Sequence, residues 1–126
     1  MSAEITKVAN VIIAASDQDR VVAFYTDVVG LEKRVELPFG DGNRWIEVAP
    51  AGAETAIAIC PPGPTTIPGG KDTGISLATG DIEALHGRLK EQGADVDAEI
   101  SRFGDAPPLF WFRDPEGNTL MAVQAA

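Results

Sequence analysis

Three kinds of residue are scarce in this chain, and each scarcity argues against a class of protein. A single cysteine, Cys60, cannot form an internal disulfide framework. A single histidine, His86, offers no Ser-His-Asp or Cys-His arrangement for nucleophilic catalysis. Only ten basic residues accompany nineteen acidic ones, and the formal net charge is −9. We therefore expect no nucleic acid and no anionic membrane as a partner.

Long apolar runs are also absent from the sequence. No stretch approaches the roughly 18 consecutive apolar residues of a membrane-spanning helix. Residues 1–9 lack the apolar segment of a secretory signal, and we expect a cytoplasmic protein. The length of 126 residues is that of one ordinary domain, which can form a core without disulfides.

The chain does contain an internal repeat with an offset of 64 residues. Asp17 and Asp81 lie 64 residues apart, and each stands where a helix is expected to begin. Asn10 and Gly74 precede these aspartates by seven residues, each within an apolar stretch typical of a strand. A period near half the chain length indicates two copies of one supersecondary unit.

Hydrophobic periodicity predicts the same order of elements, βαβββ, in both halves. One helix is expected between Asp17 and Gly30 and another between Asp81 and Gly93, because aspartate favours helix starts and glycine favours helix ends. The predicted strands are Ile5–Ala15, Leu31–Leu37, Arg44–Ala49 and Glu54–Cys60 in the first half, and Thr73–Thr79, Ala94–Phe103, Leu109–Arg113 and Asn118–Gln124 in the second.

The segment Pro61–Asp72 separates the two halves. It holds four prolines and three glycines in twelve residues, a composition that indicates a connector. We predict one domain over residues 1–126, with repeat 1 at about 2–61 and repeat 2 at about 71–124. The predicted fold class is α+β, with two βαβββ repeats pairing around a concave cleft where a small ligand would bind.

Two motifs resemble those of the vicinal oxygen chelate superfamily. Residues 24–31, Phe-Tyr-Thr-Asp-Val-Val-Gly-Leu, are similar to its "FY…LGL" helix end. Residues 112–118, Phe-Arg-Asp-Pro-Glu-Gly-Asn, are similar to its "F-x-D-P-D/E-G-N" hairpin. The superfamily contains glyoxalase I, extradiol dioxygenases, fosfomycin-resistance enzymes and bleomycin-resistance proteins, and the resemblance implies the glyoxalase/bleomycin-resistance fold.

The resemblance also implies where a metal would be held. Metal-using members take their ligands from four equivalent strand positions, which correspond here to Asn10, Ile57, Gly74 and Met121. None of these residues supplies an imidazole or a carboxylate, the ligands that such a metal needs. We therefore expect no metal and no cofactor in this chain.

Strand alternation provides a second group of candidate residues. Five residues fall on equivalent faces of two predicted strands: Trp45, Glu47, Leu109, Trp111 and Arg113. If that face lines the cleft, two indoles, a carboxylate and a guanidinium converge on a ligand. The alternatives are core packing with a structural Glu-Arg pair, or the opposite parity. The opposite parity would turn Arg44, Ile46, Phe110 and Phe112 inward.

The resemblance favours a metal-free protein that binds a small organic molecule, cationic or aromatic, as bleomycin-resistance proteins sequester a drug. It also implies a homodimer. The alternatives are a metal-dependent or metal-free lyase, isomerase or dioxygenase of the same fold, and a non-catalytic accessory subunit. Because the family ligands are missing, a binding protein is favoured over an enzyme. The predicted ligand-binding residues are Asn10, Trp45, Glu47, Ile57, Gly74, Trp111, Arg113 and Met121.

Overall fold

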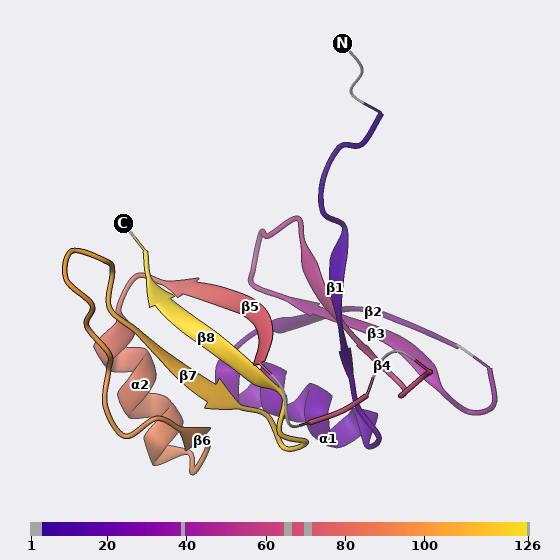
Figure 1. The fold of residues 1–126 in the computed structure, drawn as a ribbon. Helices are drawn as coiled ribbons and strands as arrows, with labels where there is room; N and C mark the ends of the chain where they lie inside the picture. The colour runs from indigo at the N-terminus through magenta and orange to yellow at the C-terminus, as the bar shows by residue number, and fades with distance from the viewer. Residues whose placement is uncertain (1–3, 39, 65–66, 70–71, 126) are drawn as a thin grey trace. The chain divides into compact units, whose positions relative to one another are not determined.

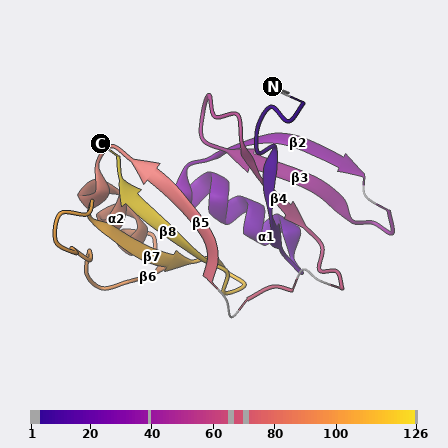
Figure 2. The ribbon, with the colours of Figure 1, turned by 45° about the horizontal axis from the view of Figure 1, so that its top comes forward.

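The chain folds into two compact units, Met1–Ile67 and Pro68–Ala126, in a computed structural model. The structure describes residues 4–38, 40–64, 67–69 and 72–125. Each unit contains a four-stranded sheet and a helix that packs against it (Figures 1 and 2). In the described part of the chain, no helix is both long enough and apolar enough to cross a membrane.

The first unit has the strand order β1-β4-β3-β2. Strand β1 runs parallel to β4, and the other neighbours are antiparallel. Helix α1 continues into a π-helical turn, η1, and packs against β3 and β4. The elements are β1 (Asn10–Ala14), α1 (Gln18–Ala23), η1 (Phe24–Val29), β2 (Glu32–Pro38), β3 (Arg44–Ala49) and β4 (Ala56–Cys60).

The second unit repeats this arrangement in the order β5-β8-β7-β6. Strands β5 and β8 are parallel, and α2 packs against β6 and β8. The common order of elements confirms the predicted α+β fold of two βαβββ repeats. The elements are β5 (Asp72–Thr79), α2 (Ile82–Glu91), β6 (Asp95–Val96), β7 (Leu109–Arg113) and β8 (Thr119–Gln124).

Both helices begin at the aspartates that the sequence indicated. The Asp17 side chain accepts a hydrogen bond from the backbone N–H of Arg20, and Asp81 accepts one from Ala84. These bonds satisfy amide groups that the first helical turn leaves without a partner. Gly30 ends the first helical segment with φ of 98°, a left-handed conformation that glycine adopts without strain.

Two predicted strands are longer than those observed by more than two residues. Strand β1 starts at Asn10 rather than at Ile5, because its neighbour β4 starts at Ala56, which lies opposite Asn10. Ile5 is consequently 91% exposed. Strand β6 covers only Asp95–Val96 of the predicted Ala94–Phe103.

The early end of β6 has a local cause at Asp97. The backbone N–H of Asp97 donates to the carbonyl of Trp111 at 3.0 Å, as a strand residue would. The Asp97 side chain then accepts a hydrogen bond from the backbone N–H of Trp111 at 3.1 Å. In a regular antiparallel pair, a backbone carbonyl would accept this bond. The side chain thus replaces the next backbone–backbone hydrogen bond between the two strands, and regular strand pairing ends there.

The 64-residue offset fails by one residue at β4 and β8. Glu47 on β3 lies opposite Ala58 on β4, and not opposite Ile57. Trp111 on β7, 64 residues after Glu47, lies opposite Met121 on β8. The β3–β4 connection is therefore one residue longer than the β7–β8 connection. The counterpart of Met121 is Ala58, which corrects the predicted equivalence of Ile57 and Met121.

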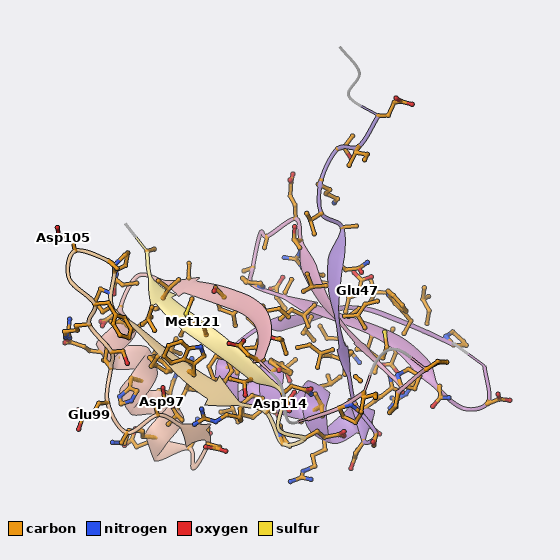
Figure 3. The ribbon with its side chains drawn as sticks, in the orientation of Figure 1. Glu47, Asp97, Glu99, Asp105, Asp114 and Met121 are labelled. Carbon is orange, nitrogen blue, oxygen red and sulfur yellow. The ribbon has the colours of Figure 1, made fainter. Side chains whose placement is uncertain are left out.

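The hairpin between β7 and β8 is held by a buried carboxylate, Asp114, labelled in Figure 3. One oxygen accepts the backbone N–H groups of Glu116 and Asn118 at 2.9 and 3.0 Å. The other accepts the side-chain amide of Asn118 at 2.9 Å. These hydrogen bonds give Asp114 a structural role in the turn.

Replacing this carboxylate should destabilise the chain strongly. We expect Asp114→Ala to lower the free energy of unfolding by about 2–4 kcal/mol, because buried donors lose their acceptor. Urea denaturation followed by circular dichroism measures the change. The matched control is Asp105→Ala in the exposed loop before β7, with an expected change within about 0.5 kcal/mol. Equal losses in the two variants would contradict the structural role of Asp114.

Candidate functional site

The first candidate surface is the face of the first sheet that carries Trp45 and Glu47. On β3, Ile46 and Val48 are almost fully buried, whereas Trp45 and Glu47 alternate with them and are half exposed. The indole Nε1 of Trp45 donates to Oε2 of Glu47 at 2.7 Å. This bond fixes the orientation of the carboxylate, which Figure 3 labels within the first unit. We call this surface the open face of the first sheet.

In the described part of the chain, no lysine or arginine neutralises the charge of Glu47. Among the residues that the structure describes, no lysine or arginine lies within ion-pair distance of Glu47. Three basic side chains of the same unit form ion pairs with other carboxylates. These ion pairs are Lys33 with Glu36, Arg34 with Glu32, and Arg44 with both Asp19 and Glu36.

Cys60 on β4 lies close enough to Glu47 for the carboxylate charge to affect the pKa of its thiol. The thiol is only 5% exposed. Burial raises the pKa of the Cys60 thiol, and the negative charge of Glu47 raises it further. A thiol of raised pKa is a poor nucleophile at neutral pH. Cys60 therefore serves packing, as its apolar strand suggested.

A row of side chains crosses the open face from β1 to β3. Ile12 lies beside Ala58, and Ala58 lies beside Glu47. Ile12 is 49% exposed, and the sequence did not indicate it as a candidate. Asn10 lies two residues earlier on β1, so it shares this face and is half exposed. Ile57 lies opposite Val48 and therefore alternates to the face away from Glu47.

The second unit has a corresponding open face. The ring of His86 on α2 lies 4.9 Å from that of Phe110, so Phe110 on β7 faces the helix. Trp111 alternates to the other face, where it lies beside Met121, and Met121 lies beside Ser76 on β5. Trp111 and Met121 are half exposed, and Met121 is labelled in Figure 3. The sequence did not indicate Ser76.

Gly74 has a conformational role in this unit. Its φ is +76°, and it lies where the β5–β8 register shifts between Asp72 and Ser76. Such a bulge favours glycine, because a residue with a side chain is strained at positive φ. A Cβ atom at Gly74 would meet no atom within 4 Å. Strain, and not lack of space, therefore disfavours larger residues there.

Arg113 is held within its own unit. Its guanidinium forms ion pairs with Asp95 at 3.0 Å and Asp97 at 3.1 Å. The backbone carbonyl of Asp97 also accepts a hydrogen bond from Nε2 of His86 at 2.7 Å. The alternative of a structural Glu-Arg pair is therefore wrong, because the carboxylates that bind Arg113 are those of Asp95 and Asp97. The convergence of the seven candidate residues other than Ile57 on one ligand stays a prediction.

The residues at the family's metal positions do not fit a metal. With Ala58 in place of Ile57, these positions hold an amide, a methyl group, a glycine and a thioether. A divalent metal that binds oxygen substrates needs imidazole or carboxylate ligands. Within the described ranges, no group of three or more His, Cys, Asp and Glu residues could hold a metal ion. The four positions are Asn10, Ala58, Gly74 and Met121.

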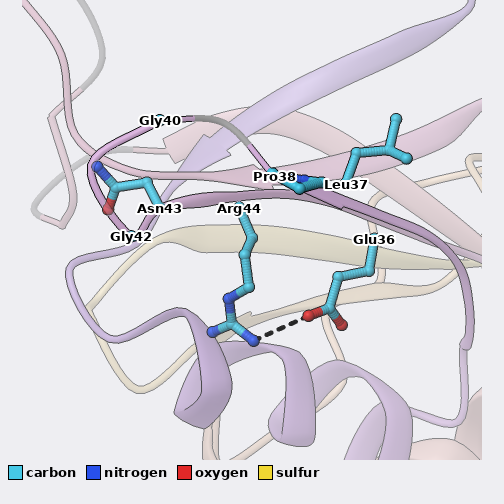
Figure 4. A pocket seen from close by; sticks show the side chains of 7 residues that line it. All are labelled: Glu36, Leu37, Pro38, Gly40, Gly42, Asn43 and Arg44. Atoms are coloured by element: carbon cyan, nitrogen blue, oxygen red, sulfur yellow. Dashed lines mark hydrogen bonds and ion pairs between the residues drawn. The ribbon is translucent and has the colours of Figure 1, made fainter.

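A separate hollow of about 380 Å³ lies at the tip of the β2–β3 hairpin (Figure 4). Arg44 lines it and pairs with Glu36 at 3.0 Å and with Asp19 at 2.7 Å. Hydrogen bonds from Lys33, and then from Arg44, lower the pKa of the Glu36 carboxyl. These charges already satisfy one another. The hollow is lined by Glu36, Leu37, Pro38, Gly40, Gly42, Asn43 and Arg44 and includes none of the predicted residues.

Comparisons with known proteins agree with the fold and the motifs. Residues 7–122 match the family model described as Glyoxalase/Bleomycin resistance protein/Dioxygenase superfamily. TnmS3, an antibiotic binding protein from Streptomyces sp. CB03234, is 32% identical, with 99% of this chain and 100% of that chain covered and a TM-score of 0.89. A superfamily member from Sphaerobacter thermophilus DSM 20745 is 31% identical, with coverages of 96% and 98% and a TM-score of 0.88. A glyoxalase/bleomycin resistance protein from Streptomyces sp. CB03234 is 33% identical, with coverages of 94% and 100% and a TM-score of 0.81.

The proximity of Glu47 to Cys60 can be tested by thiol chemistry. We expect Glu47→Gln to raise the rate at which iodoacetamide alkylates Cys60 at about pH 8, because losing the negative charge lowers the thiol pKa. Mass spectrometry of the folded protein measures the rate. Glu99→Gln removes an exposed carboxylate of the second unit and should leave the rate unchanged. Equal rates in Glu47→Gln and the parent protein would place Glu47 away from Cys60.

Proposed function

Because the chain belongs to the Glyoxalase/Bleomycin resistance protein/Dioxygenase superfamily, we propose that it binds a small organic molecule without using a metal. The observation that carries this proposal is the similarity to TnmS3, a protein described as antibiotic binding, across nearly the whole of both chains. The donor set at the family's metal positions supports the second half of the proposal, since it lacks imidazole and carboxylate groups.

The finer proposal is that this chain sequesters an antibiotic. A binding protein protects by mass action, because each occupied site lowers the free concentration of the drug. No bond in the ligand needs to be made or broken. The requirement on the protein is a set of accessible apolar and polar side chains that together recognise one molecule.

The open faces supply such side chains. Indoles offer large, rigid surfaces on which a flat ring can stack, and each unit has one half-exposed indole. Met121 adds a flexible thioether beside Trp111, a side chain that adapts to irregular ligand shapes. The proposed binding residues are Asn10, Trp45, Glu47, Gly74, Trp111, Arg113 and Met121, with Ile12 and Ser76 added and Ile57 removed.

Aromatic stacking gives the proposal its binding test. Thermal-shift screening of a panel of aromatic antibiotics should find at least one that raises the melting temperature. We expect Trp45→Ala and Trp111→Ala to weaken its binding by roughly 1–3 kcal/mol each, measured by calorimetry, because a stacking surface is lost. Conservative Trp→Phe variants should keep part of the affinity.

The same titration on protein treated with EDTA should return an unchanged affinity, since no metal takes part. Loss of binding after EDTA, or unchanged affinity in both alanine variants, would contradict the proposal. A panel without any binder would contradict it as well.

We further propose that residues 1–126 form one domain and that two chains associate as a homodimer. A single short chain has little material with which to enclose a ligand, and a second copy would supply more. Light scattering at micromolar protein concentration should therefore give about twice the mass of 13.2 kDa. A monomer under these conditions would remove this part of the proposal.

A further inference from the structure

We propose that Glu47 recognises a positively charged group of the bound molecule, so that the ligand is a planar aromatic cation. This inference rests on the proposed small-molecule binding and names the class of ligand for it. It concerns the open face of the first sheet alone.

The carboxylate of Glu47 is positioned but only partly used by the protein. Trp45 Nε1 donates to Oε2 at 2.7 Å and thereby holds the carboxylate in one orientation. Among the described residues, no other donor is bonded to Glu47, so Oε1 stays available to a ligand. A carboxylate with a fixed orientation loses less entropy when a ligand donates to it.

The immediate neighbours of Glu47 across the sheet are apolar. Val35 lies opposite it on β2, and Ala58 lies opposite it on β4, followed by Ile12 on β1. Side chains in one such row follow one another at the spacing of adjacent strands, roughly 4.8 Å. Apolar neighbours lower the local polarity, and an attraction between opposite charges is stronger there than in water.

Several carboxylates of this chain have a lysine or arginine as an ion-pair partner, whereas Glu47 has none among the described residues. Glu36 pairs with Lys33 and Arg44 in the same unit. In the second unit, Asp95 and Asp97 share Arg113. A half-buried carboxylate without such a partner is best stabilised by a cation that comes from outside the described protein.

Two further features favour a cation that carries a ring. The indole next to Glu47 offers a surface on which a flat cation is attracted to the π electrons as well as to the carboxylate. The net charge of −9 raises the local concentration of cations around the whole chain. Together, they favour one molecule that is flat and positively charged.

The test uses two probes of similar shape and different charge. 9-Aminoacridine is a planar aromatic cation at neutral pH, and acridone is a neutral ring system of similar size. Fluorescence titration of the full chain with each probe, at low and at high salt, gives the two affinities. We expect the cation to bind about tenfold more tightly than the neutral ring, and high salt should reduce that preference.

The matched variants are Glu47→Gln and Glu99→Gln, which remove one negative charge each. Glutamine at position 47 retains an oxygen that can accept the bond from Trp45, so the fold should persist. We expect Glu47→Gln to weaken binding of 9-aminoacridine about tenfold and to leave acridone unaffected. Glu99 lies on an exposed loop, and its variant should bind both probes as the parent chain does.

Each outcome decides the inference. A similar loss for both probes in Glu47→Gln, or a similar loss of 9-aminoacridine in both variants, would overturn a specific role for Glu47. Equal affinities of the parent chain for cation and neutral ring would overturn it too, while small-molecule binding would stand. Binding of neither probe would overturn this ligand class, and the antibiotic panel would then decide the proposed function separately.

Discussion

Where each candidate side chain lies depends on which face of its sheet is buried beneath the helix. On β3 this constraint buries Ile46 and Val48 and leaves Trp45 and Glu47 half exposed. On β7 it turns Phe110 toward α2 and Trp111 away from it. A shift of one residue in either strand would bury the indole and expose the core residues. Packing of the hydrophobic core therefore determines which residues of the candidate site are exposed.

The two open faces differ in whether their charged side chains have an ion-pair partner. On the second sheet, Arg113 is bound by two aspartates, and Asp97 also links the helix to β7 through His86 and Trp111. These contacts stabilise the unit, and they leave the guanidinium of Arg113 with little charge that a ligand could pair with. On the first sheet, the carboxylate is oriented by an indole and has no internal cation among the described residues. The proposed recognition of a charged ligand therefore rests on the first unit.

Much of the fold could be predicted because its signals are local. Arg44–Ala49 and Leu109–Arg113 form strands with the predicted bounds, since alternation and turns define them. Asp17 and Asp81 cap their helices through bonds that span only three residues. Strand ends were less predictable, because Ile5 can join a sheet only if a neighbouring strand extends far enough to meet it.

The candidate site could be predicted only in part. Trp45 and Glu47 were assigned correctly to one face, because alternation within a strand is a local property. The predicted equivalence of Ile57 and Met121 was wrong, because the β3–β4 connection is one residue longer than the β7–β8 connection. An extra loop residue changes which residues lie opposite one another on neighbouring strands, but it leaves the alternation within each strand unchanged. The partners of Arg113 come from a short neighbouring strand whose pairing the sequence pattern did not reveal.

The extra residue between β3 and β4 has a consequence for how the two halves are related. It places the methyl group of Ala58 where the other half carries the longer, flexible side chain of Met121. A hypothetical chain built from two copies of either half would have the same side chain at both places. The natural chain instead differs at these positions in size, flexibility and polarisability. The two halves thus present chemically distinct surfaces, which a symmetric molecule could not contact equally.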